Sequence, residues 1–233
     1  MNSESPTEDI RKIVPLFIAG GLCLFSAPIF HPNNTCAEWL MKWGQLSANK
    51  FWIPIHQVAS LGFALGAGAL LLLGIVGPRK SAGLCAGAAT SAGFLMMSLM
   101  ALVHATSVSV VGAAYNAATD NAERDSLRLL ANAFVSYDVA VDGVGAVLIS
   151  GGLVVLAWHL YRIGVASALP ALVLAGDGSI WGVQYFRLLR FVHYGFPEWV
   201  PYTSLGLWLC AVAVLLIVPR RVPVVASEAA ATA

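Results

Sequence analysis

Long, nearly uninterrupted runs of apolar residues constrain this chain more than any other feature of its sequence. Several of these runs reach the roughly 20 residues that a helix needs to cross the hydrocarbon core of a bilayer. Only 11% of the 233 residues are charged, whereas a water-soluble domain usually carries about 25%. The sequence therefore predicts an integral membrane protein whose main partner is the lipid bilayer.

The hydropathy pattern predicts one domain, residues 1–233, built as an all-α polytopic bundle of about six transmembrane helices, with five to seven compatible with the pattern. The expected spans are 13–30, 53–76, 82–113, 132–162, 163–182 and 201–219, with short polar tails at 1–10 and 222–233. The third and fourth spans are longer than a bilayer requires. We expect them to form a hairpin that extends beyond the membrane surface, with Asp120 and Glu123 capping its second helix.

Small residues recur along the predicted spans. In lipid, helices associate by close packing at such positions, so we expect one tight bundle. The positions concerned are 62–66 (GFALG), 83–87 (GLCAG), Gly143, Gly145, Gly151 and Gly152. This mode of packing is equally compatible with a homo-oligomer or with a larger membrane complex.

Two segments between the spans, both on one side of the membrane, have amphipathic patterns. CAEWLMKWGQL at 36–46 and YFRLLRFVHYGF at 185–196 combine aromatic rings with charged residues. Such patterns are typical of short interfacial helices at the level of the lipid headgroups. The alternative is that both segments are lids that tie neighbouring spans together.

Basic residues next to the spans indicate an orientation. Arg11–Lys12, Arg79–Lys80 and Arg220–Arg221 are dibasic pairs close to predicted membrane ends on one side. Positive charges of this kind remain in the cytoplasm. We therefore expect both termini in the cytoplasm and the protein in the cell membrane. The net charge of +1 gives no electrostatic support to a nucleic-acid partner.

Four polar residues from three spans are predicted to meet near the outer boundary of the membrane. Counting about 20 residues per crossing brings His56, His104, Asp138 and Asp142 to a similar depth. The two aspartates are at positions i and i+4 and therefore share one helical face, which continues through small residues into the bundle. We expect a polar pocket that opens to the outer side. His31, Asp177 and His193 are possible accessory members, whereas His159 is expected to be an anchor at the cytoplasmic interface.

Ionisable residues at membrane depth are costly and commonly mark functional sites. One interpretation is a divalent transition metal bound by His56, His104, Asp138 and Asp142. Another is a haem b with His56 and His104 as axial ligands. In either case Asp138 and Asp142 are the catalytic candidates, as groups that complete the ligand shell or move protons. The plain alternative is that residues near the interface simply reach water.

These residues favour a small metal- or haem-dependent membrane enzyme or redox subunit, an oxidoreductase acting on a lipid-phase substrate or a quinone. A transporter of small solutes, driven by protons or otherwise, is the first alternative. A structural or assembly subunit of a membrane complex is the second.

Overall fold

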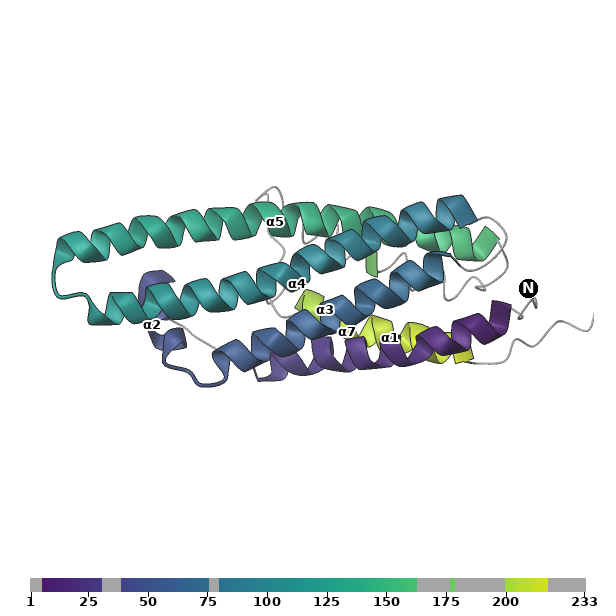
Figure 1. The fold of residues 1–233 in the computed structure, drawn as a ribbon, viewed down its shortest axis with the longest axis horizontal. Helices are drawn as coiled ribbons and strands as arrows, with labels where there is room; N and C mark the ends of the chain where they lie inside the picture. Colours follow the sequence, from purple (N-terminus) through teal and green to yellow (C-terminus); the bar gives the residue numbers. More distant parts are fainter. Residues whose placement is uncertain (1–5, 31–38, 76–79, 163–176, 179–199, 218–233) are drawn as a thin grey trace, which may run out of the picture.

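The computed structural model describes residues 6–30, 39–75, 80–162, 177–178 and 200–217, and within these ranges it is helical without strands (Figure 1). Its elements are α1 (Pro6–Ile29), α2 (Trp39–Ser47), α3 (Trp52–Gly74), α4 (Lys80–Ala117), α5 (Asn121–Arg162) and α7 (Val200–Ile217). The predicted all-α class is confirmed for this part of the chain.

Helices α3, α4 and α5 are long and apolar enough to cross a membrane. They form at the predicted spans 53–76, 82–113 and 132–162, and α3 ends at Gly74. Helices α1 and α7 form at the predicted spans 13–30 and 201–219, and α7 contains a shorter apolar stretch, Tyr202–Val214. The predicted span 163–182 lies outside the described residues except for Asp177 and Gly178. The structure thus supports a membrane protein without confirming six spans.

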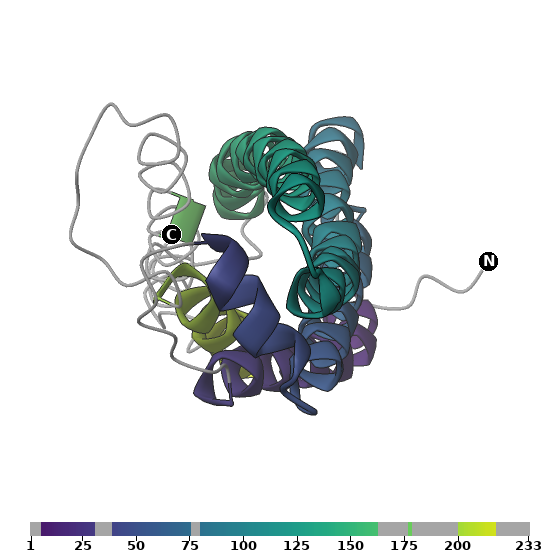
Figure 2. The ribbon, with the colours of Figure 1, turned by 90° about the vertical axis from the view of Figure 1, so that its left-hand side faces the viewer.

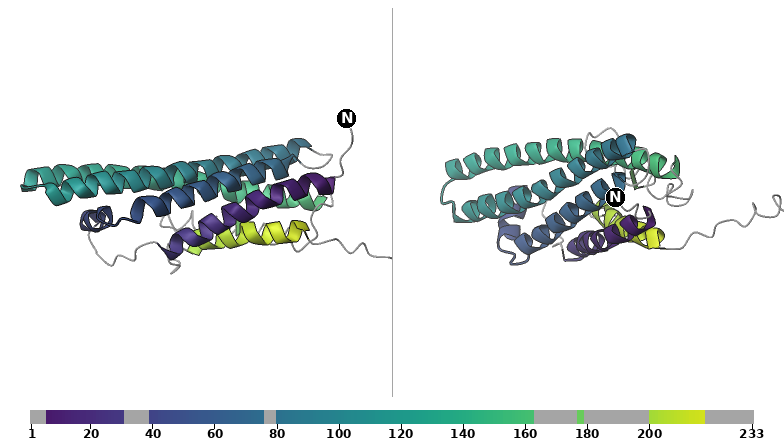
Figure 3. Two further views of the ribbon diagram at one scale, coloured as in Figure 1. Left: turned by 60° about the horizontal axis from the view of Figure 1, so that its bottom comes forward. Right: turned by 45° about the vertical axis from the view of Figure 1, so that its right-hand side comes forward.

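The long helices pack in the order α5, α4, α3, α1, α7, each against the next. Viewed along the bundle they form an arc, and α2 lies across one end of it against α4 (Figure 2). The beginnings of α1 and α4 and the end of α5 lie at one end of the bundle (Figures 1 and 3). We call this the basic end, because Lys80 and Arg162 lie there, and the end where α4 joins α5 the hairpin end.

Glycines allow the helices to approach closely, as predicted. A Cβ atom on Gly62 would lie 3.0 Å from the carbonyl oxygen of Gly20, and one on Gly152 would lie 2.8 Å from the backbone nitrogen of Thr90. Gly145 packs against the end of the Met97 side chain, 2.8 Å from the position of its Cβ atom. Gly151 is different, because no described residue lies within 4 Å of the position of its Cβ atom. Its neighbour Gly152 therefore faces α4, and Gly151 does not.

The α4–α5 hairpin is longer than a bilayer requires, with 38 and 42 residues in its two helices, or about 57 and 63 Å. Most of its exposed large apolar side chains fall within 84–102 of α4 and 139–158 of α5, whereas Val110, Leu129, Leu130 and Tyr137 lie further toward the hairpin end and Tyr161 lies toward the basic end. Each of these ranges covers about 28 Å, close to the roughly 30 Å of a hydrocarbon core. The remaining length lies on the hairpin side, where Thr106, Asn132 and Ser136 are exposed. These dimensions fit the predicted projection.

The turn of the hairpin has the predicted cap. The Asp120 carboxylate accepts a hydrogen bond from the backbone N–H of Glu123 at 2.8 Å. The Glu123 carboxylate accepts one from the backbone N–H of Thr119 at 3.4 Å. These bonds satisfy backbone donors at the beginning of α5 that have no partner within the helix.

Helix α2 forms within the predicted segment 36–46, but it packs on protein. Trp43 and Leu46 are 1% and 4% exposed, and they belong to a core cluster at the hairpin end with Trp52, Ala105, Val108, Val111 and Ala131. Helix α2 therefore connects α3 with the hairpin, which fits the alternative interpretation of this segment as a lid that joins neighbouring spans. The second amphipathic segment, 185–196, lies outside the described residues.

Candidate functional site

The imidazole of His104 and the carboxylate of Asp138 face each other between α4 and α5. His104 is as far along the chain from Lys80, at the beginning of α4, as Asp138 is from Arg162, at the end of α5. Both side chains therefore lie about 36 Å from the basic end, slightly more than a hydrocarbon core of about 30 Å. Measured from the basic end, the pair therefore lies near the outer boundary of a hydrocarbon core.

The distance between His104 Nδ1 and Asp138 Oδ2 is 2.7 Å. An ionised carboxylate can only accept, so Nδ1 of His104 donates this hydrogen bond, and Nε2 is the second ring nitrogen, which this bond does not involve. The side chains are 31% and 13% exposed. The second carboxylate oxygen, Oδ1, is buried without a hydrogen-bond partner in the described part of the chain. The pair is thus partly shielded from water but remains accessible at the imidazole.

Three aromatic rings surround the imidazole of His104. The ring centroids of Trp52 and His56, both from α3, lie 5.7 and 5.8 Å from that of His104. Trp43 from α2 meets it edge-on at 6.3 Å. Together with Asp138 of α5, side chains from α2 and α3 therefore enclose a single histidine of α4.

Hydrogen bonds hold two of these rings in place. The indole N–H of Trp52 donates to the carbonyl oxygen of Ala105 at 3.1 Å, and this bond is buried. Nδ1 of His56 donates to the carbonyl oxygen of Trp52 at 2.8 Å. The first bond joins the beginning of α3 to α4 at the residue that follows His104, so the position of His104 is determined by backbone as well as by packing.

The predicted convergence of His56, His104, Asp138 and Asp142 is observed. Asp142 is half-buried one turn along α5 from Asp138 and interacts electrostatically with both Asp138 and His104. Helices from different parts of the sequence thus bring two imidazoles and two carboxyl groups to one level of the bundle.

Asp177 does not belong to this group. It is 4% exposed, and the next residue, Gly178, packs against Ser150, Leu153 and Val154 of α5. Ser150 lies about 18 Å along α5 from Asp138. The prediction of Asp177 as an accessory member is corrected accordingly, because the small Gly178 packs against α5 well below the pair. His31 and His193 lie outside the described residues.

The metal and haem hypotheses receive no support from this arrangement. The described residues contain no group of three or more His, Cys, Asp or Glu side chains that could hold a metal ion. The rings of His56 and His104 both pack against Trp52, at 4.2 and 5.7 Å. Packed rings of this kind leave no flat slot for a porphyrin between the two histidines.

Trp43 and Trp52 also belong to the site, although neither was among the residues predicted for it. A signal for Trp52 was present, because it stands at position i−4 from His56 and therefore shares its helical face. Trp43 was recognised only as part of an amphipathic helix. Its contact with His104 depends on how α2 docks, which periodicity does not reveal.

Comparisons with known proteins identify no relative. No family model matches the chain, and neither a curated protein nor a solved structure is significantly similar to it.

Proposed function

We propose that this chain is a small membrane enzyme whose catalytic centre is the His104–Asp138 pair. His104 Nε2 takes a proton from a substrate, and Asp138 stabilises the imidazolium that forms. The substrate is a lipid-phase quinol that presents a hydroxyl group at the membrane boundary. Its two protons leave through the pair, and its two electrons pass to a second quinone of higher potential, so that one quinol is oxidised and one quinone is reduced. Asp142, one turn away, receives or returns the proton.

The 2.7 Å contact between His104 and Asp138 carries this proposal. A carboxylate on Nδ1 fixes the tautomer and orientation of an imidazole and makes Nε2 a better base. A positioned acid–base group of this kind contributes about 10²–10⁴-fold to a reaction rate. The location of the pair near the outer boundary of the hydrocarbon core supports a substrate that is itself anchored in lipid.

The arrangement of the helix ends supports an orientation of the protein in the membrane and therefore a side of the membrane for the site. Lys80 and Arg162 lie at the same end as the beginning of α1. We propose that this end faces the cytoplasm, by the preference of basic residues for that side. The hairpin and the His104–Asp138 pair then lie on the outer side of the cell membrane.

The test uses the full-length protein in proteoliposomes, incubated with a quinol, with a quinone of higher potential as the electron acceptor and with a membrane lipid extract, and analysed by mass spectrometry. We expect conversion of at least one component by the wild type. His104→Gln and Asp138→Asn should reduce conversion by about 10²-fold or more. Asp125→Asn is the matched control, because Asp125 lies on the exposed surface of the hairpin with its side chain 69% accessible and should retain full activity.

The same samples decide whether a cofactor is involved. A Soret band or a stoichiometric metal that is lost in His56→Ala and His104→Ala would restore the haem or metal version of the enzyme. Equal conversion by wild type and His104→Gln would refute the proposal, provided that both proteins unfold at the same temperature.

A proton-coupled transporter is the second candidate, and buried polar atoms away from the pair favour it. His159 is 4% exposed, so it is a buried residue and not the predicted interface anchor. Its Nε2 atom, like Ser150 Oγ and Asp177 Oδ2, is buried without a hydrogen-bond partner among the described residues. His159 lies about 32 Å along α5 from Asp138, with Ser150 between them. Polar groups thus occur at three levels of the bundle.

Proton flux separates this candidate from the enzyme. Liposomes with an imposed pH gradient and an internal pH dye should show solute-dependent proton entry if the chain is a transporter. His159→Gln would abolish that entry but leave conversion of a lipid-phase substrate unchanged. Absence of proton entry with every solute tested would remove the transporter from consideration.

A further inference from the structure

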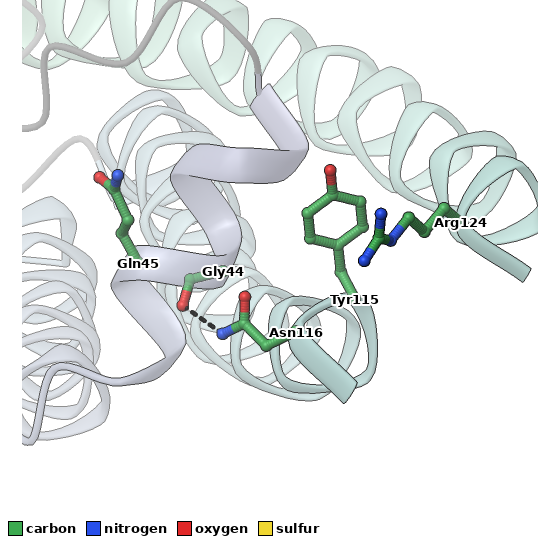
Figure 4. A pocket seen from close by; sticks show the side chains of 5 residues that line it. All are labelled: Gly44, Gln45, Tyr115, Asn116 and Arg124. Atoms are coloured by element: carbon green, nitrogen blue, oxygen red, sulfur yellow. Dashed lines mark hydrogen bonds between the residues drawn. The ribbon is translucent and has the colours of Figure 1, made fainter. Parts of the chain in front are cut away.

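A hollow of about 440 Å³ lies at the hairpin end, away from the His104–Asp138 pair. It is lined by Gly44 and Gln45 of α2, Tyr115 and Asn116 of α4, and Arg124 of α5 (Figure 4). Its volume falls within the range of small-molecule sites, about 300–1,000 Å³. Its walls come from α2 and from the two helices of the hairpin, α4 and α5.

Contacts within the protein fix the positions of the helices around the hollow without a ligand. The Asn116 side-chain amide donates to the carbonyl oxygen of Gly44 at 2.9 Å. A Cβ atom on Gly112 would collide with the carbonyl oxygen of Trp43, so α2 docks directly on α4. Arg124 donates to the carbonyl oxygen of Ala118 at 3.1 Å and lies over the Tyr115 ring at 5.8 Å. The shape of the hollow is therefore preformed.

Arg124 is the charged residue of this lining, and no carboxylate from the described residues lines the hollow beside it. The acidic residues of the same turn are occupied elsewhere. Asp120 and Glu123 accept backbone N–H groups at the cap, and Asp125 pairs with Arg128 at 3.1 Å. A guanidinium has five N–H donors, and the bond to Ala118 uses only part of this capacity. The hollow thus offers one positive charge and several donors.

The depth of the hollow argues for a dissolved ligand. Measured along the helices, Tyr115 lies about 16 Å beyond His104 on α4, and Arg124 lies about 21 Å beyond Asp138 on α5. The headgroup layer adds only about 5–8 Å per leaflet. A lipid headgroup does not reach this level, but a solute in the surrounding water does.

We propose that this hollow is a binding site for a small organic monocarboxylate from the aqueous phase. The planar carboxylate matches the fork of the Arg124 guanidinium, and the Tyr115 hydroxyl is a further donor in the lining. A single cation balances a single negative charge, which favours a monocarboxylate over a phosphate dianion. This site is separate from the proposed catalytic centre, and its existence does not depend on the proposed enzyme activity.

The test is isothermal titration calorimetry, with saturation-transfer NMR, on the full chain in nanodiscs of neutral lipid. The probes are the sodium salts of acetate, butyrate and benzoate, with inorganic phosphate and chloride as comparisons. We expect at least one carboxylate to bind, with an affinity that falls about tenfold or more in Arg124→Gln and less in Tyr115→Phe. Arg128→Gln, one turn further along α5, is the matched control and should bind like the wild type.

Arg124→Lys keeps the charge without the planar fork. It should retain weak binding. Such binding would show that the loss in Arg124→Gln comes from the lost contact and not from a folding defect. The proposal is overturned if the wild type binds none of the carboxylates at millimolar concentration. It is also overturned if Arg124→Gln binds them unchanged, or if phosphate binds better than every carboxylate.

Discussion

Asp138 Oδ2 lies 2.7 Å from Nδ1 of His104, while Oδ1 of the same carboxylate is buried without a partner in the described residues. The carboxylate therefore directs its hydrogen bonding toward one imidazole. Burying a carboxylate oxygen without a partner is costly, so its retention here fits a role for the pair beyond holding α4 and α5 together.

Asp138→Asn should change the tautomer of His104. The neutral carboxamide is a weaker acceptor than the carboxylate, so the preference of the ring proton for Nδ1 is lost and a larger fraction of His104 carries the proton on Nε2. We expect the free energy of unfolding to fall by about 1–2 kcal/mol because a charge-assisted hydrogen bond becomes a neutral one. Nitrogen-15 NMR of histidine-labelled protein reports the tautomer directly. Asp125→Asn should change neither quantity, and an unchanged His104 spectrum in Asp138→Asn would contradict the assignment.

Trp52→Phe should loosen the contact of α3 with α4 beside His104. It removes the buried indole N–H bond to Ala105 and leaves a gap in a fully packed position, so we expect a loss of about 2–3 kcal/mol in unfolding free energy. Trp158→Phe is the matched control, because Trp158 is 60% exposed and should cost little. Thermal unfolding in one detergent compares the two, and equal costs would show that the buried bond contributes nothing.

The depth of the polar residues could be predicted from the sequence because α4 and α5 are regular and antiparallel. In such a hairpin, residues equally distant from the two basic ends lie side by side, and this holds for His104 counted from Lys80 and Asp138 counted from Arg162. A fixed rise per residue therefore placed the pair at one level. The helical period likewise predicted that Asp138 and Asp142 lie on one face of α5, directed toward the bundle.

Other features depend on contacts that no periodicity encodes. The docking of α2 on α4 requires Gly112 to meet the Trp43 carbonyl group, and neither residue alone stands out in the sequence. Asp177 was placed by counting along a supposed regular span, whereas its level is determined by the packing of Gly178 on α5. The ring cluster around His104, which opposes a haem, likewise arises only when α2, α3 and α4 are assembled.

Asp120→Ala should destabilise the tip of the hairpin. The Asp120 carboxylate caps the N–H of Glu123 at 2.8 Å, and loss of an N-cap costs about 1 kcal/mol. Because the tip is far from the main core, we expect the effect to be local, with faster amide exchange at the beginning of α5. Hydrogen–deuterium exchange followed by mass spectrometry measures this. Asp125→Ala lies in the same turn without a capping role and should exchange like the wild type; faster exchange in both would point to charge and not to the cap.

Two adjacent glycines of α5 should respond in opposite ways to alanine. A Cβ atom on Gly152 would lie 2.8 Å from the Thr90 nitrogen and 3.0 Å from the Ala86 carbonyl oxygen, both backbone atoms that cannot move aside. Gly152→Ala should therefore force α4 and α5 apart at a cost of about 1–3 kcal/mol. Gly151→Ala meets open space among the described residues and should be neutral or gain up to about 1 kcal/mol from helix propensity.

Thermal unfolding of the three proteins in one detergent measures this difference, and the pair is well matched because composition and depth are the same. Separation of α4 from α5 at Gly152 also affects the His104–Asp138 contact, which lies about 21 Å further along α5. We therefore expect the His104 NMR signals to shift in Gly152→Ala and to remain in place in Gly151→Ala. Equal stability of both variants would mean that close packing at small residues does not hold this hairpin together.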